Sequence, residues 1–180
     1  MALVLDATPG GAAANSYATR AEADSYHEGH YYSSAWTALT TTQKDIALVM
    51  ATRLLDEHVE WHGTKTTRGQ ALRWPRIGVR ERDSMGLYPD PYYGYTLNSS
   101  TIPLFLKQAT AELGRHLASE DRTTDADLLE FSQISVGSLS LVKDQTRQQQ
   151  VIPDSVRAMV KPYGAVSGSG LFGTLRLVRA

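Results

Sequence analysis

Leu54-Leu55-Asp56-Glu57-His58-Val59-Glu60-Trp61-His62-Gly63 leads through a polar loop into Gln70-Ala71-Leu72-Arg73-Trp74-Pro75-Arg76. Two of the three tryptophans of the chain therefore stand beside a helix-ending glycine and a helix-breaking proline. Large aromatic side chains at chain reversals are typical of a corner anchored to a small core. The stretch contains no nucleophile paired with a base and no glycine-rich phosphate loop, so it indicates a structural role and not a catalytic one. The predicted structural anchors are Trp61, Gly63, Trp74, Pro75 and Arg76.

Composition indicates one domain with a substantial core. The chain has 180 residues, of which 42% are hydrophobic and 21% are charged. It has no cysteine, which excludes disulfides, cysteine zinc sites and thiol catalysis. The apolar run at 1–5 is too short for a signal peptide, and no stretch approaches the length of a membrane span. We therefore expect no membrane association and no export signal.

Charge is distributed along the chain in blocks of alternating sign. The net charge is −1, which argues against a nucleic-acid binder that depends on bulk electrostatics. Acidic side chains are in excess over 1–60 and 84–142, and basic ones over 61–83 and 143–180. Two interpretations stay open: the blocks are paired within the fold or solvated, or acidic and basic surfaces of identical subunits meet.

Capping residues and apolar spacing predict a mainly α fold, a small helical bundle with a long extended β-type arm or hairpin and an extended C-terminal tail. Helices are expected over about 19–32, 42–62, 103–118 and 153–163. Thr19 with Glu22 forms a capping box for the first helix. The second, central helix begins after Thr42, and Pro103 and Pro153 open the last two. The apolar face of the central helix is predicted to contain Ile46, Val49, Met50 and Leu54.

We divide the chain into an N-terminal extension (1–14), a helical domain (15–163) and a C-terminal tail (164–180). The arm, at about 132–150, is a serine-rich, β-branched segment with no single apolar face. The tail follows a Gly/Ser linker and combines apolar with basic side chains, so we expect it to dock on another surface. A Tyr/Pro-rich loop at 88–95 has no assigned role.

Several motif matches point to chemistry but are better explained structurally. The Gly-x-Gly-x-x-Gly match at 168–173 has only seven residues after it, too few for a dinucleotide fold. His58 and His62, and likewise His27 and His30, have metal-like spacing near acidic residues, yet neither pair fits a complete ligand motif. A metal-dependent enzyme is thus a minor alternative, and we expect no enzymatic activity, no metal and no cofactor.

Several short motifs stand along the chain in the following order: Asn15-Ser16-Tyr17, Glu22-Ala23-Asp24-Ser25-Tyr26, Trp36, Ala51-Thr52-Arg53-Leu54-Leu55-Asp56, Trp61-His62-Gly63, and Gln70 to Arg76 with Gly78. Ile102-Pro103, Val136-Gly137, Ile152-Pro153 and Val178-Arg179-Ala180 follow. In this order the chain resembles the tailed-phage head-to-tail adaptor proteins. The resemblance is dense from Asn15 to Gly78 and thin afterwards.

The resemblance implies a virion protein that forms a ring, usually dodecameric, under the portal in the neck between capsid and tail. The ring extends the channel through which packaged double-stranded DNA passes, without sequence-specific binding, and contacts a downstream connector or tail protein. We expect synthesis in the host cytoplasm. The tail is expected to bind the portal through Leu171, Phe172, Leu175, Arg176, Leu177, Val178 and Arg179. Contacts to other subunits or to the tail protein are expected from Ile134, Val136, Leu139, Leu141, Tyr92 and Tyr93.

The rival hypothesis is a single-stranded DNA-binding module, because related sequences are often labelled as DnaT-like, after a primosomal protein of that kind. Such a module needs a basic groove with aromatic platforms. Tyr88, Tyr92, Tyr93 and Tyr95 could stack on bases. The acidic excess over 84–142 opposes the binding of phosphates there.

Overall fold

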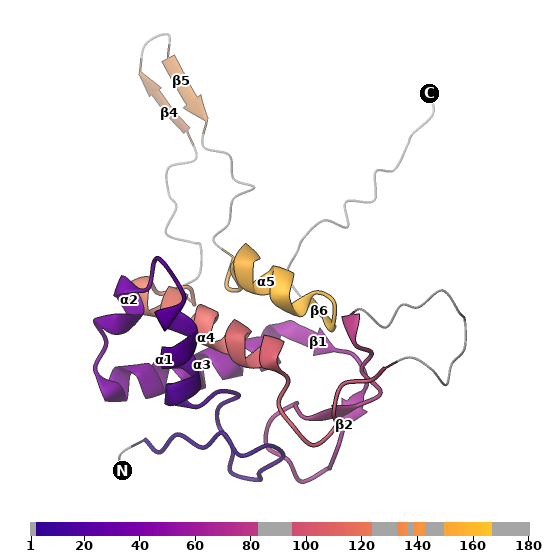
Figure 1. The fold of residues 1–180 in the computed structure, drawn as a ribbon. Helices are drawn as coiled ribbons and strands as arrows, with labels where there is room; N and C mark the ends of the chain where they lie inside the picture. The colour runs from indigo at the N-terminus through magenta and orange to yellow at the C-terminus, as the bar shows by residue number, and fades with distance from the viewer. Residues whose placement is uncertain (1–2, 83–94, 124–132, 137–138, 143–149, 167–180) are drawn as a thin grey trace, which may run out of the picture.

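The helix α4 (Leu104–Ser119) is the element around which the other helices are arranged (Figure 1). The computed structural model describes residues 3–82, 95–123, 133–136, 139–142 and 150–166. The helices in contact with α4 are α1 (Arg20–Glu28), α2 (Ser34–Thr37), α3 (Thr41–His58) and α5 (Asp154–Val160). The described residues form five helices and only short antiparallel strand pairs, which confirms the mainly α fold.

The helix starts follow local capping signals. Thr19 and Glu22 form the predicted capping box of α1, which ends at Glu28 before Gly29, earlier than expected. α3 begins one residue after Thr40, because Thr40 and Gln43 form a capping box that we did not identify. α4 and α5 each begin directly after a proline, as predicted.

The central helix ends earlier than its sequence pattern suggests. We predicted helix as far as His62, but α3 ends at His58, and Val59–Trp61 form strand β1. β1 pairs antiparallel with β6 (Gly164–Val166), with Trp61 opposite Gly164. A Cβ atom on Gly164 would lie 2.8 Å from the carbonyl oxygen of Glu60, so the close approach of the strands requires glycine. Residues 164–166, which we had assigned to the tail, are therefore held on the helical body.

The buried face of α3 also differs from the predicted one. Ile46 is 49% exposed, and Val49 and Met50 are only partly buried. Leu54 is buried as expected. The apolar side chains of α3 that are buried are Ala47, Leu48, Ala51, Leu54 and Leu55. Small side chains let α3 approach α4 closely, and this favours a face with two alanines over one with longer side chains.

Aromatic side chains from four segments form a continuous series of ring contacts in the main core. Trp61 meets Trp74 edge to face at a centroid distance of 5.7 Å, and Trp74 meets Phe105 in the same way. Phe105 in turn stacks on Tyr163 at 3.8 Å. A smaller cluster surrounds Trp36 of α2, with Leu48 from α3 and Ala111 from α4. The two clusters together connect all five helices of the described chain.

The predicted corner lies between strands β2 (Thr64–Lys65) and β3 (Arg76–Ile77). Gly63 has a φ of +70°, and a Cβ there would lie 2.3 Å from the carbonyl oxygen of Ile77. The guanidinium of Arg76 donates to the carbonyl oxygens of Trp61, His62, Gly63 and Arg73. Trp74 and Pro75, joined by a cis peptide bond, are buried. These side chains thus hold the corner together.

Residues 3–14, which we predicted as an extension, are attached to the body. The carbonyl oxygen of Asp6 accepts from the amides of Asn15 and Ser16, and that of Gly11 accepts from the amide of Ala71. Ala14 is 6% exposed. The segment therefore lies against the loop that leads to the corner.

The extended arm is a hairpin of strands β4 (Gln133–Val136) and β5 (Leu139–Val142). The sequence predicted an extended arm or hairpin at about 132–150, and the hairpin form is confirmed. Val136 is paired with Leu139 and Gln133 with Val142, while residues 137–138 between the strands lie outside the described residues.

Candidate interaction surfaces

The acidic side chains of the first charge block are largely paired inside the fold. Asp45 accepts two hydrogen bonds from the guanidinium of Arg20, at 2.9 and 2.6 Å. Asp24 lies 2.7 Å from the ammonium of Lys44. Burial alone would raise the pKa of Asp24, but the hydrogen bond from Lys44 and further donors lower it overall. Arg20 and Lys44 belong to the same block, so these pairs fix individual carboxylates within the fold while the block as a whole keeps its acidic excess.

The basic residues of 61–82, which we call the basic segment, behave differently. This segment has six basic side chains and one acidic one, Glu81. Arg76 is half-buried, and the other five are exposed: Lys65, Arg68, Arg73, Arg80 and Arg82. None of these five lies within 4.0 Å of a carboxylate among the described residues. The basic segment therefore presents cations that the described part of the body does not neutralise.

A buried polar junction fixes the backbone of the basic segment against α3. The Asp56 carboxylate accepts from the hydroxyl of Tyr17, from the indole of Trp61 at 3.3 Å and from the amide of Arg73 at 3.0 Å. Burial raises the pKa of Asp56, although these three donors oppose the effect. Tyr17 is fully buried, and burial together with the nearby carboxylate raises its pKa well above the usual value. The junction thus positions Arg73 while leaving its side chain exposed.

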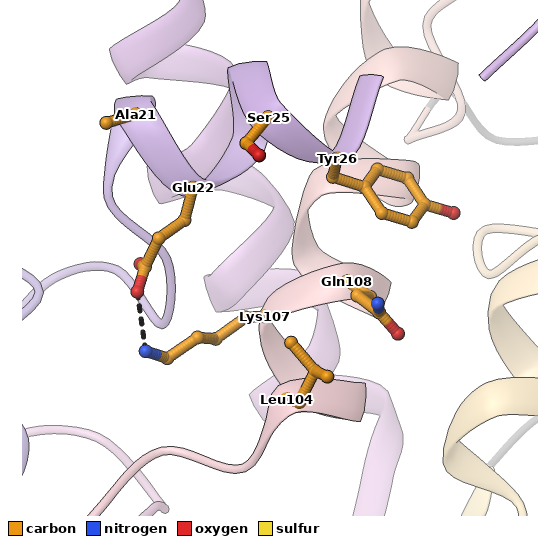
Figure 2. Close-up of a pocket in the computed structure, with 7 residues that line it drawn as sticks. All are labelled: Ala21, Glu22, Ser25, Tyr26, Leu104, Lys107 and Gln108. Carbon is orange, nitrogen blue, oxygen red and sulfur yellow. Dashed lines mark hydrogen bonds and ion pairs between the residues drawn. The ribbon is translucent and has the colours of Figure 1, made fainter. Parts of the chain in front are cut away.

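A groove of about 610 Å³ runs between α1 and α4 (Figure 2). Leu104 on its wall is 69% exposed. Glu22 and Lys107, drawn with a dashed line in Figure 2, approach to 2.6 Å between Oε1 and Nζ. Since Glu22 and Lys107 pair with each other, the groove offers a ligand a shallow apolar surface and no unpaired charge.

The histidines do not form a metal site in the described residues. His27 donates from Nε2 to the carbonyl oxygen of Ala111 and is buried. His30 and His116 flank Glu112, at 3.8 and 3.3 Å from its carboxylate oxygens. Burial opposes ionisation of Glu112, but Arg115 and the two histidines lower its pKa overall. The other predicted pair is separated, because α3 ends at His58 and His62 follows β1.

The predicted contact residues fall into two groups. Ile134, Val136, Leu139 and Leu141 lie in β4 and β5. Tyr92 and Tyr93 in the 88–95 loop lie outside the described residues, as do all seven predicted portal-binding residues of the tail: Leu171, Phe172, Leu175, Arg176, Leu177, Val178 and Arg179. The contact roles assigned to these residues stay predictions.

Sequence reasoning missed a hollow of about 450 Å³ beside α3. Arg53 lines it from α3, Lys65 from β2, and Arg73 from the loop before the corner. The positive charge of 61–83 was the only sequence signal for this site. Nothing in the sequence marks Arg53 as part of a basic site, because residues 1–60 are acidic overall and Glu57 forms an ion pair with it.

No helix of the described chain is long and apolar enough to cross a membrane. Comparison with curated proteins and with solved structures found no match to this chain. A family of proteins described as "Putative DnaT-like ssDNA binding protein" matches residues 1–180. The chain therefore belongs to this family.

Proposed function

We propose that this chain is a structural subunit of a tailed-phage virion: a head-to-tail adaptor that forms a ring beneath the portal and connects the capsid to the tail. In this role the protein acts in the virion neck after synthesis in the host cytoplasm. It extends the DNA channel and has no enzymatic activity. The ring is proposed to have twelve subunits, as the resemblance of its motifs implies.

The observation that carries this proposal is the β4–β5 hairpin. The two strands pair only with each other among the described strands, and Figure 1 draws the hairpin away from the helices. Each strand thus has one edge that no described strand covers. An isolated two-stranded hairpin is at best marginally stable in water. Contact with a neighbouring chain would stabilise it, and this requirement favours an assembly subunit.

The test is assembly of the full-length protein with a purified portal ring. We expect amides of 133–142 to exchange rapidly in the free subunit and slowly in the complex. Equal protection in both states would mean that the hairpin is stable without neighbours, and the proposal would lose its main support. Deletion of 171–180 is expected to leave the melting temperature nearly unchanged and to abolish portal binding. If the truncated protein still binds the portal, the tail is not the attachment element.

Single-stranded DNA binding is the second candidate, and the family description supports it more directly than it supports the adaptor role. The basic segment adds a physical reason, because its exposed cations could neutralise phosphates. Tyr95, which is 76% exposed, lies beside this segment: its carbonyl oxygen accepts from the amide of Glu81 at 2.9 Å. An exposed aromatic ring next to cations is the combination that single-strand binders use.

The two candidates differ in what the purified chain binds by itself. An adaptor subunit is expected to bind a portal ring and to bind short DNA weakly. A single-strand binder is expected to bind an oligothymidine at submicromolar affinity in about 0.15 M salt, with strong salt dependence. Titration of the same preparation with labelled oligothymidine and with portal separates them.

A further inference from the structure

The hollow beside α3 brings together cations from three separate elements. Its floor follows one face of α3 from Val49 to Glu57, about 12 Å at the helical rise. The rest of the lining comes from Ala14 and Asn15, from Lys65 of β2, and from residues 71–73 of the loop before the corner. Because five of its lining residues, from Val49 to Glu57, follow α3, we call this hollow the trough.

The charges in the trough are in positive excess. Arg53, Lys65 and Arg73 line it, against the two carboxylates of Asp56 and Glu57. The Asp56 carboxylate is already occupied by three hydrogen-bond donors. Glu57 is the only other carboxylate in the lining, and it lies 3.6 Å from the guanidinium of Arg53. Lys65 and Arg73 therefore form no ion pair within 4.0 Å of a described carboxylate, although the charge of Arg73 acts on Asp56 from farther away and lowers its pKa.

The trough is also held in a fixed shape. The amide of Arg73 donates to both Asp56 and the Tyr17 hydroxyl, and the amide of Tyr17 donates to the Thr52 hydroxyl at 3.1 Å. Lys65 Nζ donates to the carbonyl oxygen of Gln70 at 3.3 Å. These bonds join Tyr17, α3 and the loop, so the backbone that carries Arg73 is fixed before any ligand arrives.

We propose that this trough binds the phosphate backbone of single-stranded nucleic acid, with Lys65 and Arg73 as the principal phosphate contacts and Arg53 as a third. A stacked strand carries one phosphate per about 3.4 Å, so a 12 Å trough accommodates roughly three, one for each cation. The apolar atoms of Val49, Ala71 and Leu72 provide a surface for sugars. The inference rests on the second candidate function and assigns residues to it.

The magnitude follows from counterion release. For single strands the logarithm of the affinity falls with the logarithm of salt concentration by about 0.7 per neutralised phosphate. At about 0.1 M salt each cation then contributes roughly a fivefold gain in affinity, and two contribute roughly 25-fold. The variant Lys65→Ala/Arg73→Ala should therefore bind a labelled oligothymidine about 25-fold more weakly and lower the salt slope by about 1.4.

Three further variants sharpen the test. Lys161→Ala removes one exposed cation at the end of α5, outside the trough, and should leave both affinity and slope nearly unchanged. Glu57→Gln removes a competing carboxylate and should strengthen binding severalfold. Arg73→Lys keeps the charge and should retain most of the binding, which separates a phosphate contact from loss of folding. Thermal melting of each full-length variant checks that the fold is retained.

The outcomes separate the site from the function. If the unmodified chain does not bind the oligonucleotide, both the site and the second candidate function are wrong. If it binds but the double variant keeps its affinity and slope, the DNA-binding function stands and the site is elsewhere. If a polyglutamate peptide competes with DNA equally well, the trough recognises an acidic protein and the nucleic-acid assignment is wrong.

Discussion

Replacing Tyr17 with phenylalanine tests the buried junction that connects the N-terminal segment to α3 and the corner. Tyr17 is fully buried, and its hydroxyl donates to Asp56 and accepts from the amide of Arg73 at 3.2 Å. Phenylalanine keeps the ring and removes only these hydrogen bonds. The amide of Arg73 keeps its bond to Asp56, so the main loss is the donor to the carboxylate.

A hydrogen bond to a charged group contributes about 1.5–3 kcal/mol. We therefore expect Tyr17→Phe to lower the free energy of unfolding by about 2 kcal/mol at pH 7. For a chain of this size, that corresponds to a fall of roughly 4–8 °C in melting temperature. Urea unfolding followed by tryptophan fluorescence measures the loss directly, because Trp61 and Trp74 lie in the core beside the junction.

The same variant has a predicted pH dependence. Burial raises the pKa of Asp56 in the folded state above the usual value of 3.8. Below pH 3.8 the carboxyl is protonated in both states, so it costs no stability. As pH rises from 3.8 through the folded pKa, ionising the buried carboxyl lowers the free energy of unfolding. Among the interactions that lower the pKa of Asp56, the hydrogen bond from the Tyr17 hydroxyl is the largest. Its removal should raise the pKa of Asp56 further, and the destabilisation should shrink as pH falls from 7 toward 3.8.

Tyr31→Phe is the matched control, because the Tyr31 side chain is 92% exposed and should lose less than about 0.5 kcal/mol. A loss for Tyr17→Phe as small as that of the control would refute the reasoning. So would a destabilisation that stays constant with pH, because Asp56 would then not respond to the missing hydroxyl.

Three further substitutions test the core, the strand pairing and the buried carboxylate. Leu54 is 3% exposed, so Leu54→Asp should bury an unpaired charge and unfold the domain; a soluble variant with a cooperative melting transition would contradict the core assignment. Gly164→Ala should cost about 1–3 kcal/mol in urea unfolding, because the added Cβ meets the Glu60 carbonyl oxygen. Gly69→Ala, with open space around it, should cost less than about 1 kcal/mol, and equal losses would mean that the pairing tolerates a side chain. Glu112→Gln should cost about 3 kcal/mol at neutral pH, since it leaves a partly buried guanidinium unpaired. The Glu112 pKa is lowered in the fold, so this loss should diminish as pH falls below 4.5 through its folded pKa; a loss independent of pH would show that the charge does not matter.

Local signals were sufficient for most helix starts. Thr19 with Glu22, Pro103 and Pro153 each fix a start through the residues that immediately follow them. The capping box at Thr40 and Gln43 was equally visible, and it was missed because Thr42 is also a good cap.

The end of α3 could not be predicted from nearby residues. Val59 continues the apolar spacing of the helix, and nothing local distinguishes it from a helical residue. It becomes a strand residue because it pairs with Val166, more than one hundred positions later in the chain. The same limit applies to the trough, because Arg53, Lys65 and Arg73 lie in separate elements and only the fold brings them to one surface.

The pairing of charged side chains in the structure also affects how identical subunits would contact each other. Complementary acidic and basic faces were one of two interpretations of the sequence. Glu22, Asp24 and Asp45 instead pair with cations of their own chain, whereas the exposed cations of the basic segment do not pair with described carboxylates. A ring that depended on acidic-to-basic contacts would thus have to use other acidic side chains of that block, such as the exposed Glu28 and Glu60. If subunits assemble through the hairpin and the tail, assembly should depend weakly on salt, while nucleic-acid binding by the trough should depend on it strongly.

Native mass spectrometry or sedimentation across a salt series, run beside the oligonucleotide titration, distinguishes these two responses. Dissociation of the ring in parallel with loss of DNA would mean that the same cations serve both contacts.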